Sequence, residues 1–218
     1  MDEPDRLAQA QREHWQNTYA AHPGMYGDQP SIPALHAVEI LRTVGAKDVL
    51  ELGAGHGRDS LHFARQGFGV LATDFSAVGL QQLRDRADAA GLRGPRTAVI
   101  DVRDHLPLAD KSVDAVYAHM LLCMALSTQE IVALVDEIRR VLRPGGAFLY
   151  TVRHTGDAHY GSGIAHGDDI FEHGGFAVHF FSRRLVDELA KGWKVLEVKE
   201  FEEGELPRRL WNVVLLRP

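Results

Sequence analysis

A glycine-rich turn between a short apolar run and a polar helical segment constrains the fold more than any other feature of the sequence. The run VLEL at 49–52 leads into the turn GAGHG at 53–57, and RDSLHFARQ follows at 58–66. Glycines let the backbone turn tightly and approach a ligand without a Cβ clash, and the free N–H groups at a helix start can bind that ligand. Ligands of open α/β sheets bind beyond the carboxyl ends of the strands. The segment therefore predicts a strand, a ligand-binding turn and a helix.

Strands and helices continue to alternate after this turn. Four further apolar runs are expected to be strands, at 68–74, 96–101, 113–120 and 147–152. Helical segments separate them, one from the capping residue Ser76 to about residue 90 and one at 128–142, which the turn RPGG ends. Strands that alternate with helices imply parallel βαβ crossovers. We therefore expect an α/β fold with a Rossmann-like, doubly wound sheet and helices on both faces.

The 218 residues suit a single domain with four parts. Residues 1–45 are expected to form an N-terminal helical cap, 46–152 the ligand-binding core, and 181–218 a helix and an antiparallel hairpin. Residues 153–180 are rich in Gly, His and Asp and show little periodicity. A long aperiodic segment in a compact domain is usually functional, so we expect a lid or insertion over the carboxyl edge of the sheet.

The charge and hydropathy of the chain disfavour several kinds of partner. The net charge is −6 and no run of Lys or Arg occurs, so we expect no nucleic-acid partner. No apolar stretch reaches the ~20 residues of a membrane helix, and the acidic start MDEPDRLAQA does not resemble a signal peptide. We therefore expect a cytoplasmic protein without a membrane partner, present as a monomer or a homodimer.

Acidic residues at the ends of the second and third strands extend the expected ligand site. The carboxylate of Asp74 can accept hydrogen bonds from both hydroxyls of a ribose, because Ser76 already fills the role of helix cap. Asp101 can accept a hydrogen bond from an adenine amino group, with Val102 against the ring. The turn and these residues together predict a cofactor that contains adenosine.

A nicotinamide-dependent oxidoreductase is one alternative that the same turn allows. Its fingerprint G-x-G-x-x-G would place the third glycine at position 58, where the chain has Arg58. Short-chain enzymes of that class also use a Tyr-x-x-x-Lys pair, and none of the five tyrosines has lysine four residues later. The spacing G-x-G-x-G therefore favours another cofactor.

The ordered motifs ELGAGHGRDS, ATDFS, IDVRD, LPLADKSVDAVYAH and EIRRVLRPGGAFLYTV resemble those of class I S-adenosylmethionine-dependent methyltransferases over residues 47–152. The part GRDSLHFARQGFGVLATDFS is similar to the tellurite-resistance and thiopurine methyltransferase branch, which acts on small molecules. The resemblance implies a sheet of about seven strands in the order 3-2-1-4-5-7-6 with strand 7 antiparallel. It also implies S-adenosylmethionine as cofactor, released as S-adenosylhomocysteine after in-line methyl transfer (EC 2.1.1.-) to a small-molecule acceptor.

The same resemblance implies which residues contact the cofactor. They lie in the turn, at the ends of the strands and in the segments that precede the core: Gly53, Ala54, Gly55, Arg58, Asp74, Phe75, Ser76, Asp101, Val102, Ala118, Tyr19 and Tyr26. Gly53, Ala54 and Gly55 would face the methionine part, and Phe75 would cover the adenine. A non-catalytic protein that binds S-adenosylmethionine is the alternative within this family.

Histidines are the expected catalytic residues. His119 ends the fourth strand beside the cofactor, and His154 opens the insertion. Five of the twelve histidines lie in 153–180, where they can belong to a solvated lid, supply a base or form a metal site. Their spacing matches no compact zinc pattern, so no metal ligand is expected.

Overall fold

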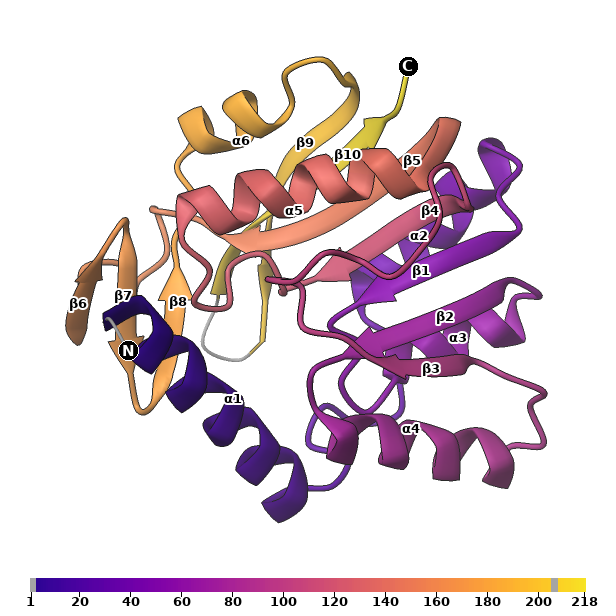
Figure 1. Ribbon diagram of the computed structural model, residues 1–218, viewed down its shortest axis with the longest axis horizontal. Coiled ribbons are helices and arrows are strands. Elements are labelled where there is room, and N and C mark those ends of the chain that lie inside the picture. The colour runs from indigo at the N-terminus through magenta and orange to yellow at the C-terminus, as the bar shows by residue number, and fades with distance from the viewer. Residues whose placement is uncertain (1–2, 205–207) are drawn as a thin grey trace.

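A seven-stranded sheet runs through the molecule (Figure 1). The computed structural model describes residues 3–204 and 208–218. The strand order is β3-β2-β1-β4-β5-β10-β9. The strands are β1 (Asp48–Leu52), β2 (Gly69–Asp74), β3 (Arg96–Val99), β4 (Val113–His119), β5 (Leu142–Arg153), β9 (Lys194–Glu203) and β10 (Arg208–Leu216). The first five are parallel and β10 is antiparallel to both of its neighbours. The α/β fold and the order 3-2-1-4-5-7-6 are thereby confirmed, with β9 and β10 as the sixth and seventh strands.

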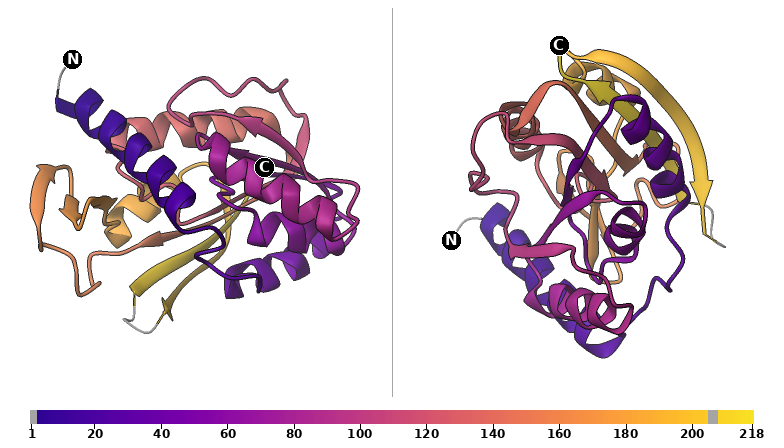
Figure 2. Two further views of the ribbon diagram at one scale, coloured as in Figure 1. Left: turned by 90° about the horizontal axis from the view of Figure 1, so that it is seen from below. Right: turned by 90° about the vertical axis from the view of Figure 1, so that its right-hand side faces the viewer.

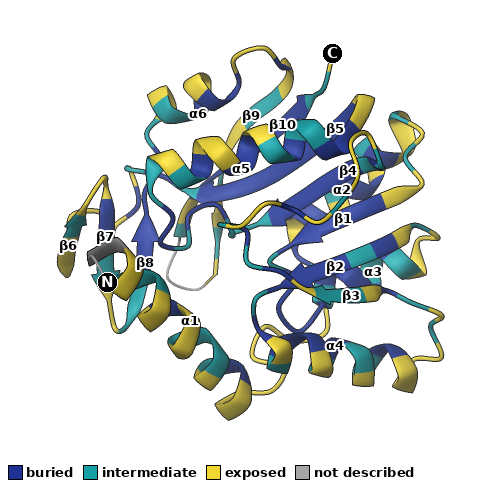
Figure 3. Cartoon of the chain, in the orientation of Figure 1, coloured by how far each residue is buried: buried dark blue, intermediate teal, exposed yellow. Residues whose placement is uncertain are grey.

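Helices pack on both faces of this sheet (Figure 3). The described helices are α1 (Glu3–Ala21), α2 (Ile32–Thr43), α3 (Arg58–Arg65), α4 (Ala77–Ala89), α5 (Thr128–Val141) and α6 (Arg183–Leu189), of which α1 lies against α4 and β8. One apolar cluster joins α5 and α6 to the sheet, and a second joins α2, α3 and α4 to it. The adjacent β1 residues Val49 and Leu50 belong to different clusters, because successive strand side chains point to opposite faces.

Serine residues fix where several helices begin. Ser31 and Ser76 accept hydrogen bonds from the backbone N–H groups of Ala34 and Gly79, each at 3.1 Å. A side-chain oxygen at this position satisfies a helix N–H that has no partner within the helix. The cap at Ser76 agrees with the sequence analysis, and it lies two residues after Asp74.

Residues 153–180, expected to form a lid or insertion, contain a small antiparallel sheet. It contains β6 (Ile164–Gly167), β7 (Ile170–His173) and β8 (Phe176–His179) in that order. Four-residue strands bounded by glycines carry too little alternation to be recognised in a sequence. The expected turn RPGG likewise lies within β5, where the register with β4 shifts between Val113 and Ala115.

Helix α1 connects this small sheet to the half of the molecule that contains the glycine turn (Figure 2). Gln11 Nε2 donates to Gly175 O at 2.8 Å beside β8, and Gln82 Nε2 of α4 donates to Tyr19 O at 2.7 Å. The helix therefore lies across the sheet end where the glycine turn is found. Within the described residues, no helix is long and apolar enough to cross a membrane.

Gly57 offers a test of how tightly the turn packs on α4. It has φ +81°, and a Cβ added there would lie 2.2 Å from Leu83 Cγ. We expect Gly57→Ala to destabilise the fold by about 2–4 kcal/mol, from the left-handed backbone and the clash together. Gly67→Ala is the matched control, because Gly67 has φ +90° with nothing within 4 Å of the added Cβ. Gly67→Ala should lower the free energy of unfolding, measured in urea, by about 1 kcal/mol. Equal losses of stability in the two variants would contradict the packing argument.

Candidate functional site

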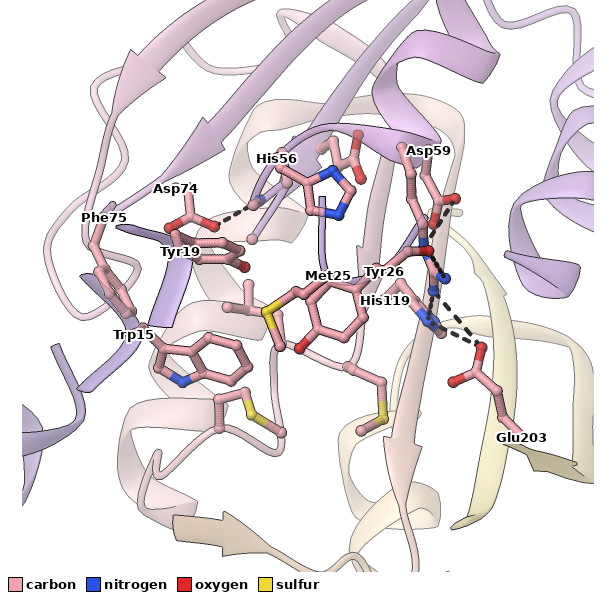
Figure 4. A pocket seen from close by; sticks show the side chains of 18 of the residues that line it. Trp15, Tyr19, Met25, Tyr26, His56, Asp59, Asp74, Phe75, His119 and Glu203 are labelled. Atoms are coloured by element: carbon pink, nitrogen blue, oxygen red, sulfur yellow. Dashed lines mark hydrogen bonds and ion pairs between the residues drawn. The ribbon is translucent and has the colours of Figure 1, made fainter. Parts of the chain in front are cut away.

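A cavity of about 330 Å³ opens at the carboxyl ends of β1, β2 and β4 (Figure 4). Its walls come from the glycine turn, the ends of these strands, α1 and the loop after it, and the ends of β9 and β10. This position is the one expected for a ligand of a doubly wound sheet.

The glycine turn forms one wall because neighbouring side chains lie directly against its backbone. A Cβ on Gly55 would meet Tyr19 Oη at 2.4 Å, and one on Gly53 would meet Leu121 Cδ1 at 2.9 Å. Both glycines also have positive φ, which disfavours other residues. Only glycine fits at these two positions.

Asp74 is fixed in the cavity wall by two backbone hydrogen bonds. One carboxylate oxygen accepts from Gly55 N at 2.8 Å and the other accepts from Ser76 N at 2.7 Å. Burial raises the pKa of this carboxyl to about 6, although both hydrogen bonds act in the opposite direction. Each oxygen keeps a free lone pair that can accept a ligand hydroxyl.

A second acidic group lies beneath the turn, and the sequence analysis did not identify it. Glu51 and Asp59 are both 3% exposed and both line the cavity. Asp59 accepts hydrogen bonds from Ser31 N and Ser31 Oγ, each at 2.7 Å, and Glu51 accepts one from Ser60 Oγ. Burial, and then the charge of Asp59, raise the pKa of Glu51 well above its usual value. The sequence did contain one indication of this group, since Glu51 interrupts the apolar run VLEL.

The opposite end of the cavity holds a cluster of His119, Arg58 and Glu203. Arg58 Nη2 lies 3.1 Å from His119 Nε2 and 3.7 Å from Glu203 Oε1. His119 Nε2 lies 3.6 Å from the same Glu203 oxygen. Glu203 ends β9, so the antiparallel hairpin contributes to a site for which the sequence analysis named no hairpin residue.

Nine of the predicted site residues line this cavity. They are Tyr19, Tyr26, Gly53, Ala54, Gly55, Arg58, Asp74, Phe75 and His119. His56, to which the sequence analysis gave no role, also lines it and stacks on Tyr26 with ring centroids 5.8 Å apart. Burial lowers the pKa of His56 to about 4, with Arg86 and Arg58 adding to the shift.

The other five predicted residues lie outside the cavity lining. Ser76 caps α4, and Ala118 and Val102 are buried in the core. Asp101 is paired with Arg12 and Arg103. His154 packs on Trp211 with ring centroids 5.0 Å apart, so the structure does not bring it to His119.

The remaining histidines of 153–180 lie outside the cavity lining, and His159 and His173 contact each other with ring centroids 5.8 Å apart. His179 Nδ1 lies 2.7 Å from Leu126 O, and His166 Nε2 lies 2.9 Å from Glu172 Oε2. In the part of the chain that the structure describes, no three His, Cys, Asp or Glu side chains are grouped to hold a metal ion.

Because Glu51 is buried, replacing it with a neutral residue should stabilise the fold, by an amount that depends on pH. A carboxyl whose pKa is raised by folding stabilises the fold most at low pH, and this contribution is lost as the pH rises. At pH 8 the free energy of unfolding of Glu51→Gln, measured in urea, should therefore exceed that of the wild type by about 1 kcal/mol or more. The difference should shrink at pH 5. Glu39→Gln, at a side chain 80% exposed, is the control. A Glu51→Gln variant less stable than the wild type at pH 8 would contradict this account.

Comparison with known proteins supports the class that the motifs indicated. Residues 49–146 match the family model described as a methyltransferase domain. An uncharacterized methyltransferase of Mycobacterium bovis is 36% identical over 119 residues, which are 54% of this chain and 44% of that protein. The chain thus spans less than half the length of this curated relative.

Solved methyltransferase structures share the fold. The 1,6-didemethyltoxoflavin-N1-methyltransferase of Burkholderia thailandensis, with bound 1,6-didemethyltoxoflavin and S-adenosylhomocysteine, has a TM-score of 0.76 at 19% identity and covers 100% of this chain and 91% of that chain. TehB from Haemophilus influenzae has a TM-score of 0.67 at 17% identity, over 84% of this chain and 62% of that one. Residues 49–146 thus match a methyltransferase domain, and the chain shares its fold with solved methyltransferases.

Proposed function

We propose that this protein transfers a methyl group from S-adenosylmethionine to a small-molecule acceptor. The observation that carries the proposal is the position of Asp74, a buried carboxylate bonded to Gly55 N at 2.8 Å and exposed to the cavity beside the glycine turn. Such a group can hold both hydroxyls of a ribose while the turn approaches the rest of the nucleoside.

The charges that line the cavity favour this cofactor over a dinucleotide. Four carboxyl groups, those of Glu51, Asp59, Asp74 and Glu203, face two guanidinium groups, those of Arg58 and Arg208. S-adenosylmethionine carries a sulfonium and an ammonium group, which acidic neighbours attract. The pyrophosphate of a nicotinamide dinucleotide would be repelled by the same residues.

The chemistry of the cofactor determines what the protein itself has to do. When bound, S-adenosylmethionine supplies an electrophilic methyl group, so the protein has to align the acceptor and exclude water. Trp15 and Tyr19 of α1 close one side of the cavity, and His119 faces it from the end of β4. The likeness to TehB supports the branch indicated by the sequence, and the small-molecule acceptor is part of this proposal.

Calorimetric titration with S-adenosylmethionine and, separately, NADH tests the cofactor. We expect micromolar binding of the first and no binding of the second. Asp74→Ala should remove binding without unfolding the protein, because the carboxylate is the proposed ribose acceptor. Binding of NADH alone, or unchanged affinity in a folded Asp74→Ala variant, would contradict the proposal. Cofactor binding without release of S-adenosylhomocysteine across thiol, halide and phenol acceptors would instead favour a non-catalytic binding protein.

Asp74 also predicts how this affinity depends on pH. The ribose hydroxyls need the ionised carboxylate, and the pKa of Asp74 in the free protein is about 6. Affinity should therefore fall by up to about tenfold for each pH unit below 6. Asp74→Asn should bind more weakly and lose this dependence, whereas Asp104→Asn, at an exposed aspartate, should retain it. A flat affinity between pH 7 and pH 5 in the wild type would show that Asp74 does not contact the ligand.

A further inference from the structure

The two ends of the cavity differ in chemistry (Figure 4). Asp74, Phe75 and Tyr19 lie at one end, and His119 and Glu203 lie at the other. Under the proposed function, on which this inference rests, the cofactor occupies the Asp74 end. The His119 end is then left for the methyl acceptor, and its side chains define the class of that acceptor.

A backbone irregularity brings two consecutive residues, His119 and Met120, into the same cavity. Successive side chains of a strand point to opposite faces, but Met120 has φ +58° and turns the chain at the end of β4. This left-handed conformation costs free energy in a residue other than glycine. The buried hydroxyl of Thr151 on β5 holds it in place, because Thr151 Oγ1 accepts from Met120 N at 3.1 Å.

The same hydroxyl fixes the proton position on His119. Thr151 Oγ1 lies 2.7 Å from His119 Nδ1, and Arg58 Nη2 lies 3.1 Å from His119 Nε2. A guanidinium can only donate, so Nε2 accepts and the ring proton is on Nδ1, which donates to Thr151. Nε2 therefore carries the lone pair of the ring, which accepts a hydrogen bond from Arg58 in this structure, and an acceptor O–H or N–H can donate to it in place of Arg58.

Glu203 is placed to stabilise the imidazolium that would result. Its Oε1 lies 3.6 Å from His119 Nε2, and its Oε2 lies 3.9 Å from Arg208 of β10. Burial raises the pKa of Glu203, but His119, Arg58 and Arg208 outweigh burial and lower it, so the side chain is ionised. Arg58 opposes protonation of His119 from α3, and its charge is shared with Asp59 at 3.8 Å.

The cavity lining also holds apolar, polarisable side chains. Three of the four methionines of the chain, Met25, Met120 and Met124, line the cavity. Thioethers adapt to irregular shapes and pack favourably against ring edges. The guanidinium groups of Arg58 and Arg208 are balanced by the carboxylates of Asp59 and Glu203, so this end offers no excess charge to a permanently charged acceptor.

We propose that the acceptor is a planar aromatic or heteroaromatic molecule with an ionisable O–H or ring N–H, and that His119 Nε2 accepts its proton. The acceptor oxygen or nitrogen forms a bond to the methyl carbon while the carbon–sulfur bond breaks. The sulfur keeps that electron pair and becomes a neutral thioether, and the acceptor proton passes to His119. Thr151 and Glu203 are positioning residues, since they act on His119 and not on the acceptor.

Two phenols of different acidity separate base catalysis from simple positioning. Phenol is protonated at pH 8, whereas 4-nitrophenol is largely ionised and needs no base. We expect the wild type to methylate both, and His119→Gln to lose about 100-fold or more of kcat/KM with phenol but less than about tenfold with 4-nitrophenol. Equal losses with both phenols would overturn the role of His119. Methylation of thiophenol alone would overturn the acceptor class. The same holds if the protein binds S-adenosylmethionine but neither binds nor methylates any of the ring probes.

Positioning by Thr151 and Glu203 has a readout that needs no turnover. In ¹⁵N-histidine NMR spectra, the wild type should show His119 as the Nδ1–H tautomer. Thr151→Val should change this tautomer and Thr151→Ser should restore it, while Glu203→Gln should lower the pH at which His119 becomes protonated. An unchanged His119 signal in Thr151→Val would overturn its positioning role. Calorimetry on the same variants reports S-adenosylmethionine binding, so loss of the proposed function would be seen separately.

Discussion

The hydrogen bond from Gly55 N to Asp74 joins the two parts of the chain on which the site depends. It links the turn after β1 to the end of β2, and therefore fixes how far apart these neighbouring parallel strands end. Ser76 continues the connection by donating its backbone N–H to the same carboxylate and by capping α4. A ligand bound at this point contacts backbone that is already ordered, which reduces the entropy lost on binding.

Under the proposed function, the remaining side chains divide the cavity into a nucleoside end at Asp74 and a reactive end at His119. Glu51 and Asp59 are buried behind the turn. The raised pKa of Glu51 shows that its ionised form is disfavoured there. Acidic groups that destabilise the free protein can be retained because they attract a cationic ligand. At the reactive end, Thr151 sets both the histidine and the methionine that follow β4. Neighbouring strands of the sheet therefore position both residues at the cavity.

Local pattern was sufficient to predict the core and the glycine turn. The alternation of strands and helices, the serine caps and the positions of Gly55 and Asp74 all follow from short-range rules of sequence. Glu203 and Arg208 could not be found in this way, because only the antiparallel return of β10 beside β5 brings the hairpin to His119. His154 illustrates the opposite case. The sequence analysis predicted it as a catalytic residue, but it packs on Trp211 and does not line the cavity. Long-range placement of side chains depends on tertiary packing that periodicity does not contain.

A crystal structure of the complex with S-adenosylhomocysteine tests the central claim most directly. The account predicts that the ribose hydroxyls lie within hydrogen-bond distance of Asp74, that the homocysteine part lies along the turn at 53–55, and that the sulfur faces the end of the cavity that holds His119. A ligand bound elsewhere, or a ribose that makes no contact with Asp74, would contradict it.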